Sequence, residues 1–365
     1  MPELHVNTLV ALLAFAAGIV FGATAQRTNF CTMGAISDMV NLQDYRRFRS
    51  WLLAIAVAIA GSQALHLAGL VDLGRSIYLA PNLGWLGAIV GGLMFGFGMT
   101  LAGGCGNKTL VRIGTGNLKS LVVAIVLGLF AYMTLRGIIG LARVAWIEPT
   151  GLALQAIGGQ GLPDLLARAT GLAPAPARGA LAALAAGVLA WICFRDRDFR
   201  ASPRDIAGGA IIGLLIPAGW MITGIAGADD FDPTPLASFT FVAPIGEGLV
   251  YLMTFSGATI NFGIAAVGGV ISGSFVAAIA ARRFRVESFT NAPDMLRHLA
   301  GGALMGTGGV LALGCTVGQG ITGLSTLAAG SLIAFAAIVA GGIAGMKYLE
   351  EGSLAGAARA MLARG

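Results

Sequence analysis

Apolar stretches alternate with short polar or charged segments along the whole chain. Nine of these stretches have the length of about 20 residues that a helix needs to cross a bilayer. They lie at approximately 8–25, 50–70, 84–103, 120–140, 178–194, 207–225, 262–281, 297–313 and 331–349. The pattern predicts an all-α integral membrane protein with about nine transmembrane helices.

Four shorter apolar pieces, flanked by glycine, lie between these spans. They cover about 29–40, 105–115, 244–254 and 315–327. Each piece is too short to cross a bilayer and too apolar for a solvated loop. Interrupted backbone is tolerated at membrane depth only where it is buried in protein or lines a cavity. We therefore expect four short re-entrant helices.

A glycine-rich segment that ends in cysteine occurs twice. Residues 91–105 read GGLMFGFGMTLAGGC and residues 301–315 read GGALMGTGGVLALGC, with eight of fifteen positions identical at an offset of 210. The order span, short piece, span, span, short piece, span also occurs twice. Equivalent helices are five crossings apart, which predicts two repeats of opposite orientation, as in many transporters.

Domain boundaries and orientation follow from this order. We expect a first inverted repeat at 1–140, an extramembrane linker plus an extra transmembrane helix at 141–206, a second inverted repeat at 207–350 and a cytoplasmic tail at 351–365. Lysine and arginine are concentrated on one predicted side, 18 against 5. The positive-inside rule places that side in the cytoplasm. The interpretation is a bacterial plasma (inner) membrane protein with a periplasmic N-terminus and a cytoplasmic C-terminus.

Composition excludes several classes of protein. The chain is 56% hydrophobic and 11% charged, whereas soluble domains carry roughly 25% charged residues. Its 56 glycines lie largely inside the apolar stretches, where small residues let helices approach closely. The four cysteines have no zinc-site spacing, and three histidines are too few to favour a metal or haem centre. No cofactor is expected.

Two cysteines stand where a long span stops at glycines and a short helix is expected to begin. Cys105 lies in the run GGCGNK, and Cys315 lies in GCTVGQG. Backbone N–H groups and the positive end of the helix dipole make such a position suitable for an anion. A buried cysteine can also be a small hydrophobic residue, but a pair related by the repeat favours a shared functional site near the midplane.

Further candidates are less specific. Cys31 lies where a polar segment turns apolar, and Cys193 is interpreted as structural. Lys108 and Arg27 are cations near membrane-buried turns, where charges are costly and often functional. The alternative for both is a side chain that extends to the cytoplasmic surface.

Three uncharged side chains lie in glycine-rich turns: Asn107, Gln319 and Asn261. They could bind substrate oxygens, or they could satisfy backbone groups freed by broken helices. Glu247 is the only acid in the third short piece, and a capping or gating role is a hypothesis for it.

The combination of helix starts, cations and thiols predicts the substrate class. Helix starts and cations favour a small anion. A neutral thiol is a weak, polarizable donor that suits sulfur, and weak donors also permit release. We therefore predict a transporter of a sulfur-containing oxyanion. The rival hypotheses are a persulfide-forming enzyme, which would need an activating base near the thiol, and a structural subunit of a larger complex.

Four runs of residues carry a resemblance to a known family. They are RTNFCTMGAISD, GGCGNKTLVRIGTGNLKSLVV, SGATINFGIAAVGGVISGSF and ALGCTVGQGITGLSTLAAGS. Together they resemble the YeeE/YedE family over nearly the whole chain. The resemblance implies nine spanning and four short helices, with cavities on both faces. It also implies import of thiosulfate, passed along cysteines by S–H hydrogen bonds without covalent chemistry. Cys31, Cys105 and Cys315 match the cysteine positions of the family motifs.

One departure and one partner follow from the same resemblance. Thiosulfate importers of this family carry a further cysteine in the outer half of the second repeat, and residues 255–261 contain none. Another sulfur or selenium oxyanion therefore stays open as the substrate. Family importers often pair with a small cytoplasmic sulfur-carrier protein of the TusA type, which a cytoplasmic C-terminus would suit.

Overall fold

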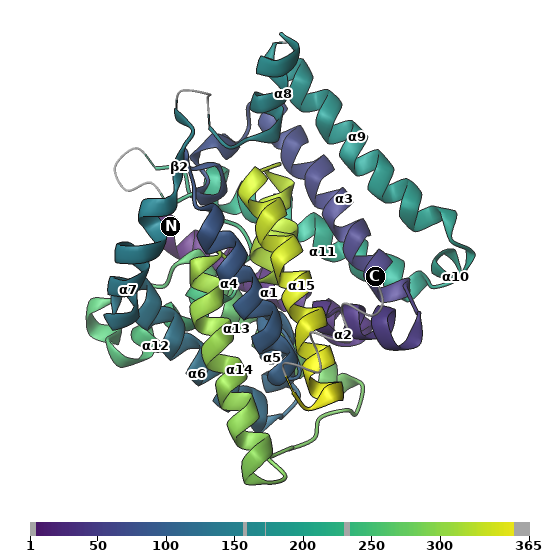
Figure 1. Ribbon diagram of the computed structural model, residues 1–365, viewed down its shortest axis with the longest axis vertical. Helices are drawn as coiled ribbons and strands as arrows, with labels where there is room; N and C mark the ends of the chain where they lie inside the picture. The colour runs from purple at the N-terminus through teal and green to yellow at the C-terminus, as the bar shows by residue number, and fades with distance from the viewer. Residues whose placement is uncertain (1–4, 156–158, 172, 230–233, 354–365) are drawn as a thin grey trace.

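The described part of the protein is a bundle of long helices with almost no strand (Figure 1). The computed structural model describes residues 5–155, 159–171, 173–229 and 234–353. Its longer helices are α1 (Val6–Thr28), α3 (Arg46–Leu67), α4 (Trp85–Leu101), α6 (Leu118–Arg136), α9 (Pro174–Arg195), α11 (Pro203–Met221), α13 (Phe262–Ala280), α14 (Ala292–Leu311) and α15 (Ala329–Glu351). The prediction of an all-α integral membrane protein is confirmed.

Eight segments of the described chain are long and apolar enough to cross a membrane. The ninth predicted span, 297–313, is not among them, although α14 forms a 20-residue helix there. The reason is that α14 begins earlier than expected, and its first turns carry Asp294, Arg297 and His298. These polar side chains lower the mean hydropathy of a helix whose later turns are rich in glycine.

The four short pieces are helical. They form α2 (Thr32–Ser37) with the π-helical turn η1 (Asp38–Leu42), α5 (Gly106–Gly114), α12 (Val242–Met253) and the π-helical turn η9 (Gly318–Gly323). Two of the eight apolar segments run on into such a piece, at Val6–Leu42 and Trp85–Gly114. At these two places the short helix thus continues from a spanning helix after a turn.

The predicted linker also has ordered structure. It contains α7 (Ile138–Ala142), η4 (Arg143–Ile147), η5 (Glu148–Thr150), β2 (Leu152–Ala153) and α8 (Leu162–Thr170). Strand β2 pairs antiparallel with β1 (Asn82–Leu83), which ties the linker to the connection between α3 and α4. That connection also contains the short turns η2 (Leu73–Arg75) and η3 (Ile77–Leu79). Three further short elements each follow a helix: α10 (Arg197–Arg200) after α9, η7 (Ile222–Ala226) after α11 and η8 (Phe255–Gly257) after α12.

Glycines allow the two predicted repeats to pack backbone against backbone. An alanine Cβ at Gly91 in α4 would lie 2.6 Å from the Gly308 oxygen in α14, and one at Gly301 in α14 would lie 2.7 Å from the Gly98 oxygen in α4. The offset of 210 pairs Gly91 with Gly301 and Gly98 with Gly308, so the contacts are reciprocal. An exchange of equivalent partners between two repeats would produce this reciprocity. Their opposite orientation stays a prediction.

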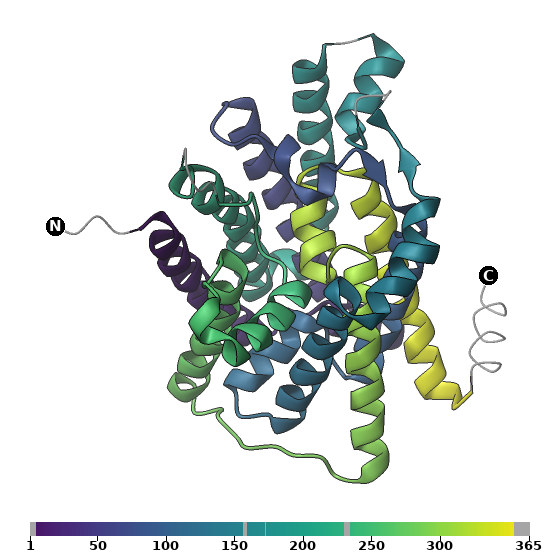
Figure 2. The same cartoon turned by 90° about the vertical axis from the view of Figure 1, so that its left-hand side faces the viewer.

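The same kind of contact joins α1 to α13. A Cβ at Gly18 would lie 2.5 Å from the Ala266 oxygen, and one at Gly22 would lie 2.1 Å from the Val270 oxygen. Helix α3 packs against α11, and α4 and α6 pack against α15 and α14. Figure 2 shows the purple α1 beside green helices of the second half. Each long helix of the first half therefore has its main partner in the second half or the linker.

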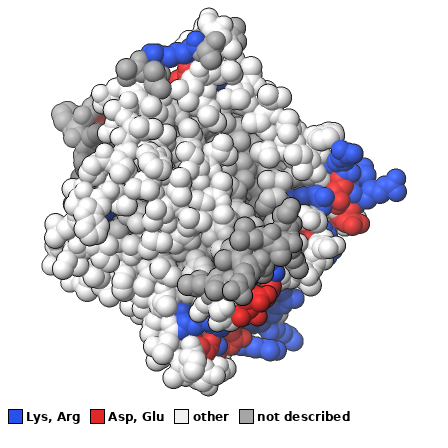
Figure 3. All heavy atoms as spheres, viewed as in Figure 1, with Lys and Arg blue, Asp and Glu red and all other residues white. Residues whose placement is uncertain are grey.

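The surface fits a lipid environment. Charged side chains gather near the edges of the face shown in Figure 3, and the broad area between them is almost free of charge. Helix α9 lies at the periphery, since only 22% of its most apolar window is buried. Its exposed side chains include Leu184, Val188 and Trp191.

Candidate functional site

The same turn places both repeat-related cysteines. After α4, Gly103 adopts a left-handed φ of +68°, and after α14, Leu313 adopts a left-handed φ of 58° at the equivalent position. The next residue closes the turn in both copies, because Gly104 N donates to Met99 O at 2.8 Å and Gly314 N donates to Gly309 O at 2.7 Å. Each cysteine follows directly and precedes a short helix, as the sequence predicts.

All three candidate cysteines are buried at helix starts. Cys105 and Cys315 are 0% exposed and Cys31 is 3% exposed. The Cys31 sulfur accepts a hydrogen bond from Gly34 N at 3.5 Å, and the Cys315 sulfur accepts one from Gly318 N at 3.4 Å. Cys31 is the N-cap of α2 and Cys105 is the N-cap of α5. The thiols therefore stand beside N–H groups that have no intrahelical partner of their own.

The three cysteine turns converge. The side chain of Cys105 neighbours that of Cys31, and it also neighbours that of Thr316. Thr316 directly follows Cys315. The side chains of Cys31, Cys105 and Thr316 thus form a continuous line that leads to the Cys315 turn.

Cations are present at the Cys31 end of this line. The half-buried Lys108 donates from Nζ to Asn29 Oδ1 at 2.5 Å. Arg47 donates to the Asn29 carbonyl at 2.9 Å and pairs with Asp38 at 2.7 Å. Two cations and one carboxylate leave a positive balance beside Cys31. Arg27 is exposed, and its carbonyl accepts a hydrogen bond from Arg204 at 2.6 Å, so the described contacts do not join Arg27 to the thiols.

Four buried polar atoms on the cysteine turns have no hydrogen-bond partner in the described part of the chain. They are Thr32 Oγ1, Asn107 Oδ1, Thr316 Oγ1 and Gln319 Oε1. The amide nitrogens of the two amides are used, since Asn107 donates to Phe30 O at 3.3 Å and Gln319 donates to Ala312 O. An unpaired buried polar group costs about 1–3 kcal/mol. Such atoms are expected where a polar ligand binds only transiently.

The structure separates Asn261 from this group. Asn261 is exposed, and its Oδ1 accepts a hydrogen bond from Ile264 N at 2.9 Å as the N-cap of α13. Its Nδ2 donates to Glu247 at 2.7 Å. The bond to Ile264 N satisfies a backbone group, which is one of the two roles left open by the sequence, and a role in binding substrate stays a prediction. Cys193 packs in a small separate cluster with Leu53 and Phe199, and its thiol donates to the Arg49 carbonyl at 3.2 Å, which is typical of a structural cysteine.

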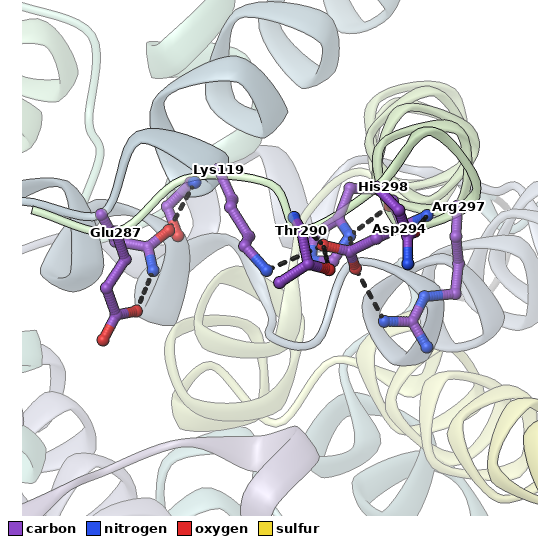
Figure 4. A network of polar contacts seen from close by, with 9 residues as sticks. Lys119, Glu287, Thr290, Asp294, Arg297 and His298 are labelled. Atoms are coloured by element: carbon purple, nitrogen blue, oxygen red, sulfur yellow. Dashed lines mark hydrogen bonds and ion pairs between the residues drawn. The ribbon is translucent and has the colours of Figure 1, made fainter.

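A histidine lies nearer to the cysteine turns than the sequence suggests. Figure 4 shows the network around Asp294, which accepts hydrogen bonds from Lys119 at 2.7 Å and Arg297 at 3.2 Å. The His298 ring contacts Asp294 through Nδ1, and its Nε2 would lie 3.9 Å from a Cβ on Gly103. The lysine lowers the pKa of Asp294 to about 2. The contacts of His298 in the described chain place it against the α4 turn, not against a thiol.

Three residues near Cys315 were not among the candidates from the sequence: Tyr78, Thr240 and Gln160. Tyr78 in η3 is 4% exposed, and its hydroxyl lies over Gly318 together with Thr240. Gln160 of the linker donates to Ala80 O at 2.8 Å. Tyr78, Gln160 and Gln319 line a pocket of about 20 Å³, which has room for about one water molecule. A short loop without periodicity gives no sequence signal for such a contact.

Comparisons with known proteins agree with this architecture. A family profile described as sulphur transport matches residues 27–344. The chain is 28% identical over 324 residues to the thiosulfate transporter TsuA of Escherichia coli, covering 83% of this chain and 84% of the relative. It is 26% identical over 322 residues to the thiosulfate transporter TsuA of Spirochaeta thermophila, covering 85% and 90%. It is 32% identical over 102 residues to the probable transporter YedE of Escherichia coli, covering 27% and 23%.

Proposed function

The chain belongs to the sulphur transport family, and from this membership we propose that it imports thiosulfate across the bacterial inner membrane. It is a multi-pass membrane transporter and not an enzyme. The observation that carries the proposal is the line of buried side chains Cys31, Cys105 and Thr316 that leads to Cys315. The line joins two turns that the repeat relates, so it passes from one half of the molecule to the other.

The chemistry of this line suits thiosulfate. Neutral S–H groups are weak, polarizable donors that do not repel an anion, and they suit its terminal sulfur. The hydroxyls of Thr32 and Thr316 have no other partner within the described residues, so they can serve the oxygens. Helix-start N–H groups add favourable electrostatics. Because each contact is weak, the anion can pass from one group to the next and leave.

Charge supports the direction of transport. Lys108 and Arg47 lie at the Cys31 end, which the positive-inside rule assigns to the cytoplasm. The described contacts of Cys315, at the other end, include no lysine or arginine. An anion that enters from the periplasm would thus move toward the positive end. A periplasmic N-terminus, a cytoplasmic C-terminus and inverted repeats at 1–140 and 207–350 are parts of this proposal.

A second substrate class has one specific observation in its favour. The segment 255–261 contains no cysteine, and Phe255–Gly257 forms the exposed turn η8. Another sulfur or selenium oxyanion is therefore the alternative cargo of the same path.

A cytoplasmic sulfur-carrier protein of the TusA type is the proposed partner. The positive-inside rule places the tail at 351–365 in the cytoplasm, where it could meet such a carrier. Most of this tail, from residue 354, lies outside the described residues.

Uptake of radiolabelled thiosulfate, in cells that lack their own importers, tests the proposal. Cys105→Ala and Cys315→Ala should each lose most uptake at unchanged membrane expression. Lys108→Ala should weaken uptake, since it removes a cation beside Cys31. Cys193→Ala is the matched control, because Cys193 is equally buried but packs in a separate cluster with Leu53 and Phe199.

Two results would contradict the proposal in different ways. Wild-type cells without thiosulfate uptake, but with uptake of selenite or sulfite, would assign another anion. Equal loss in Cys193→Ala and Cys105→Ala would show that uptake reports general damage by cysteine substitution and not a thiol path.

A further inference from the structure

Two hydroxyls from separate loops meet over the Cys315 turn. A Cβ on Gly318 would lie 2.5 Å from Thr240 Oγ1 and 3.4 Å from the Tyr78 hydroxyl. The N–H of the same Gly318 donates to the Cys315 sulfur at 3.4 Å. Tyr78 belongs to the connection between α3 and α4, and Thr240 lies just before α12. The two hydroxyls therefore cover the first turn of the helix that starts at Cys315.

The two ends of the thiol line differ at one equivalent position. The residue three places after Cys105 is Lys108, and the residue three places after Cys315 is Gly318. Lys108 extends from its helix and reaches Asn29. At Gly318 the space for a side chain is occupied by Tyr78 and Thr240. One end thus offers a cation from the helix itself, and the other offers neutral hydroxyls supplied by loops.

Tyr78 is held firmly in this position. Its ring packs edge-on against Trp220 with centroids 6.5 Å apart. The loop is fixed before Tyr78, where Leu73 N donates to His66 Nδ1 at 3.2 Å. It is fixed after Tyr78, where Gln160 donates to Ala80 O at 2.8 Å. The ring is thus positioned by Trp220 and by a loop that is fixed before and after it.

Beyond Tyr78 lies the pocket that it shares with Gln160 and Gln319. The pocket also includes Gly84 and Leu313, which are exposed, so it leads to the surface. Its volume of about 20 Å³ holds about one water molecule. An oxyanion is larger than water, so the pocket at this size does not admit one. Tyr78 forms part of its wall, and a displacement of Tyr78 would widen it.

We propose that Tyr78 is the outer gate of the path, and that its hydroxyl and that of Thr240 bind the oxygens of the entering anion. The gate holds water away from Cys315 in the closed state. The role as an anion-binding gate rests on the proposed transport function, whereas the shielding of Cys315 does not. Neutral hydroxyls recognise an oxyanion without retaining it as tightly as a cation would.

The shielding is tested by labelling a protein in which Cys315 is the only cysteine, after Cys31→Ser, Cys105→Ser and Cys193→Ser. A membrane-impermeant ammonium methanethiosulfonate is added from the periplasmic side of spheroplasts. Tyr78→Ala should raise the rate of Cys315 labelling by about tenfold or more, since the local barrier to solvent access is removed. Tyr251→Ala is the matched control and should leave the rate unchanged, because Tyr251 packs on Phe255 in η8.

The result that overturns the gate is an unchanged labelling rate in Tyr78→Ala with normal insertion and a monodisperse profile. If Tyr78→Ala does not insert, Tyr78→Leu replaces it, since leucine keeps apolar contact with Trp220 but is smaller than the ring. Labelling needs no thiosulfate, so a wild type that fails to import thiosulfate would refute the substrate and not the gate.

The role of the hydroxyl is tested separately in the protein with all its cysteines. Tyr78→Phe keeps the ring, so Cys315 should stay as shielded as in the wild type. Uptake at low thiosulfate should fall several-fold, because one oxygen-binding donor is lost. Unchanged uptake at every thiosulfate concentration would overturn the anion-binding part of the proposal.

Discussion

Alanine at Gly91 or Gly301 should weaken the crossing of α4 and α14. In each case the added Cβ would lie 2.6 Å from the nearest backbone atom of the other helix. Non-bonded carbon contacts are favourable at about 3.5–4.0 Å, so the two helices must separate by about 1 Å to admit the methyl group. The backbone atoms cannot rotate away as a flexible side chain could.

The expected loss follows from two opposing effects. Overpacking a well-packed interior costs about 1–3 kcal/mol. Alanine in a helix is more favourable than glycine by about 0.5–1 kcal/mol. The free energy of unfolding should therefore fall by roughly 1–2 kcal/mol in either variant. Because both methyl groups press on the same crossing, the double variant should lose less than the sum of the single losses.

The assay is the thermal midpoint of purified protein in detergent, followed by loss of the monodisperse peak in size-exclusion chromatography. Gly187→Ala in α9 is the matched control, since a Cβ there meets nothing within 4 Å. It should leave the midpoint unchanged or raise it slightly. A Gly91→Ala midpoint equal to that of Gly187→Ala would refute the close crossing, and full additivity in the double variant would refute the shared interface.

Three further outcomes are expected. Asp294→Asn should lower the thermal midpoint near neutral pH. The folded pKa of Asp294 is depressed from 3.8 to about 2, so the difference from wild type should persist down to about pH 5 and shrink as the pH falls toward 2. A difference that does not depend on pH would contradict the ion pair. Asn261→Ala should cost about 1 kcal/mol of stability through the lost cap and leave the KM for uptake unchanged, whereas a raised KM would return Asn261 to the path. Leu313→Gly should raise the thermal midpoint, since glycine removes about 1 kcal/mol of strain from this left-handed backbone conformation. Gly103 already occupies the equivalent position in the first repeat. A lower midpoint would mean that the exposed leucine side chain makes a stabilising packing contact.

The sequence predicted the elements that depend on local pattern. The turns at Cys105 and Cys315 were predictable because glycine, cysteine and the end of an apolar run coincide twice at one offset. The start of α14 was not, since its first turns are polar. Lys119 of α6 compensates the charge of Asp294 at 2.7 Å, and a hydropathy pattern contains no information about that distant partner.

The candidate site was predictable only in part, because a local sequence pattern contains no information about contacts between residues that are distant in the chain. Cys31, Cys105 and Lys108 lie on turns with distinctive composition, and the structure brings them together with Asn29. Tyr78 contributes through a contact over Gly318, 240 positions away in the chain. A single aromatic residue in an irregular loop carries no period from which such a contact can be inferred.

The pairing of α1 with α13 has a consequence for biosynthesis. The glycine-lined face of α1 packs against α13, after which only two long helices, α14 and α15, are synthesised in the described chain. At about 5–20 residues per second, the 233 residues between α1 and α13 take about 12–47 s to synthesise. During that time α1 stays in the bilayer without its partner, so the nascent chain depends on the insertion machinery or on lipids to cover that face. Premature termination before α11 would leave α1, α3, α4 and α6 all without their main partners from the second half, and such fragments should be degraded and not accumulate as a half-transporter.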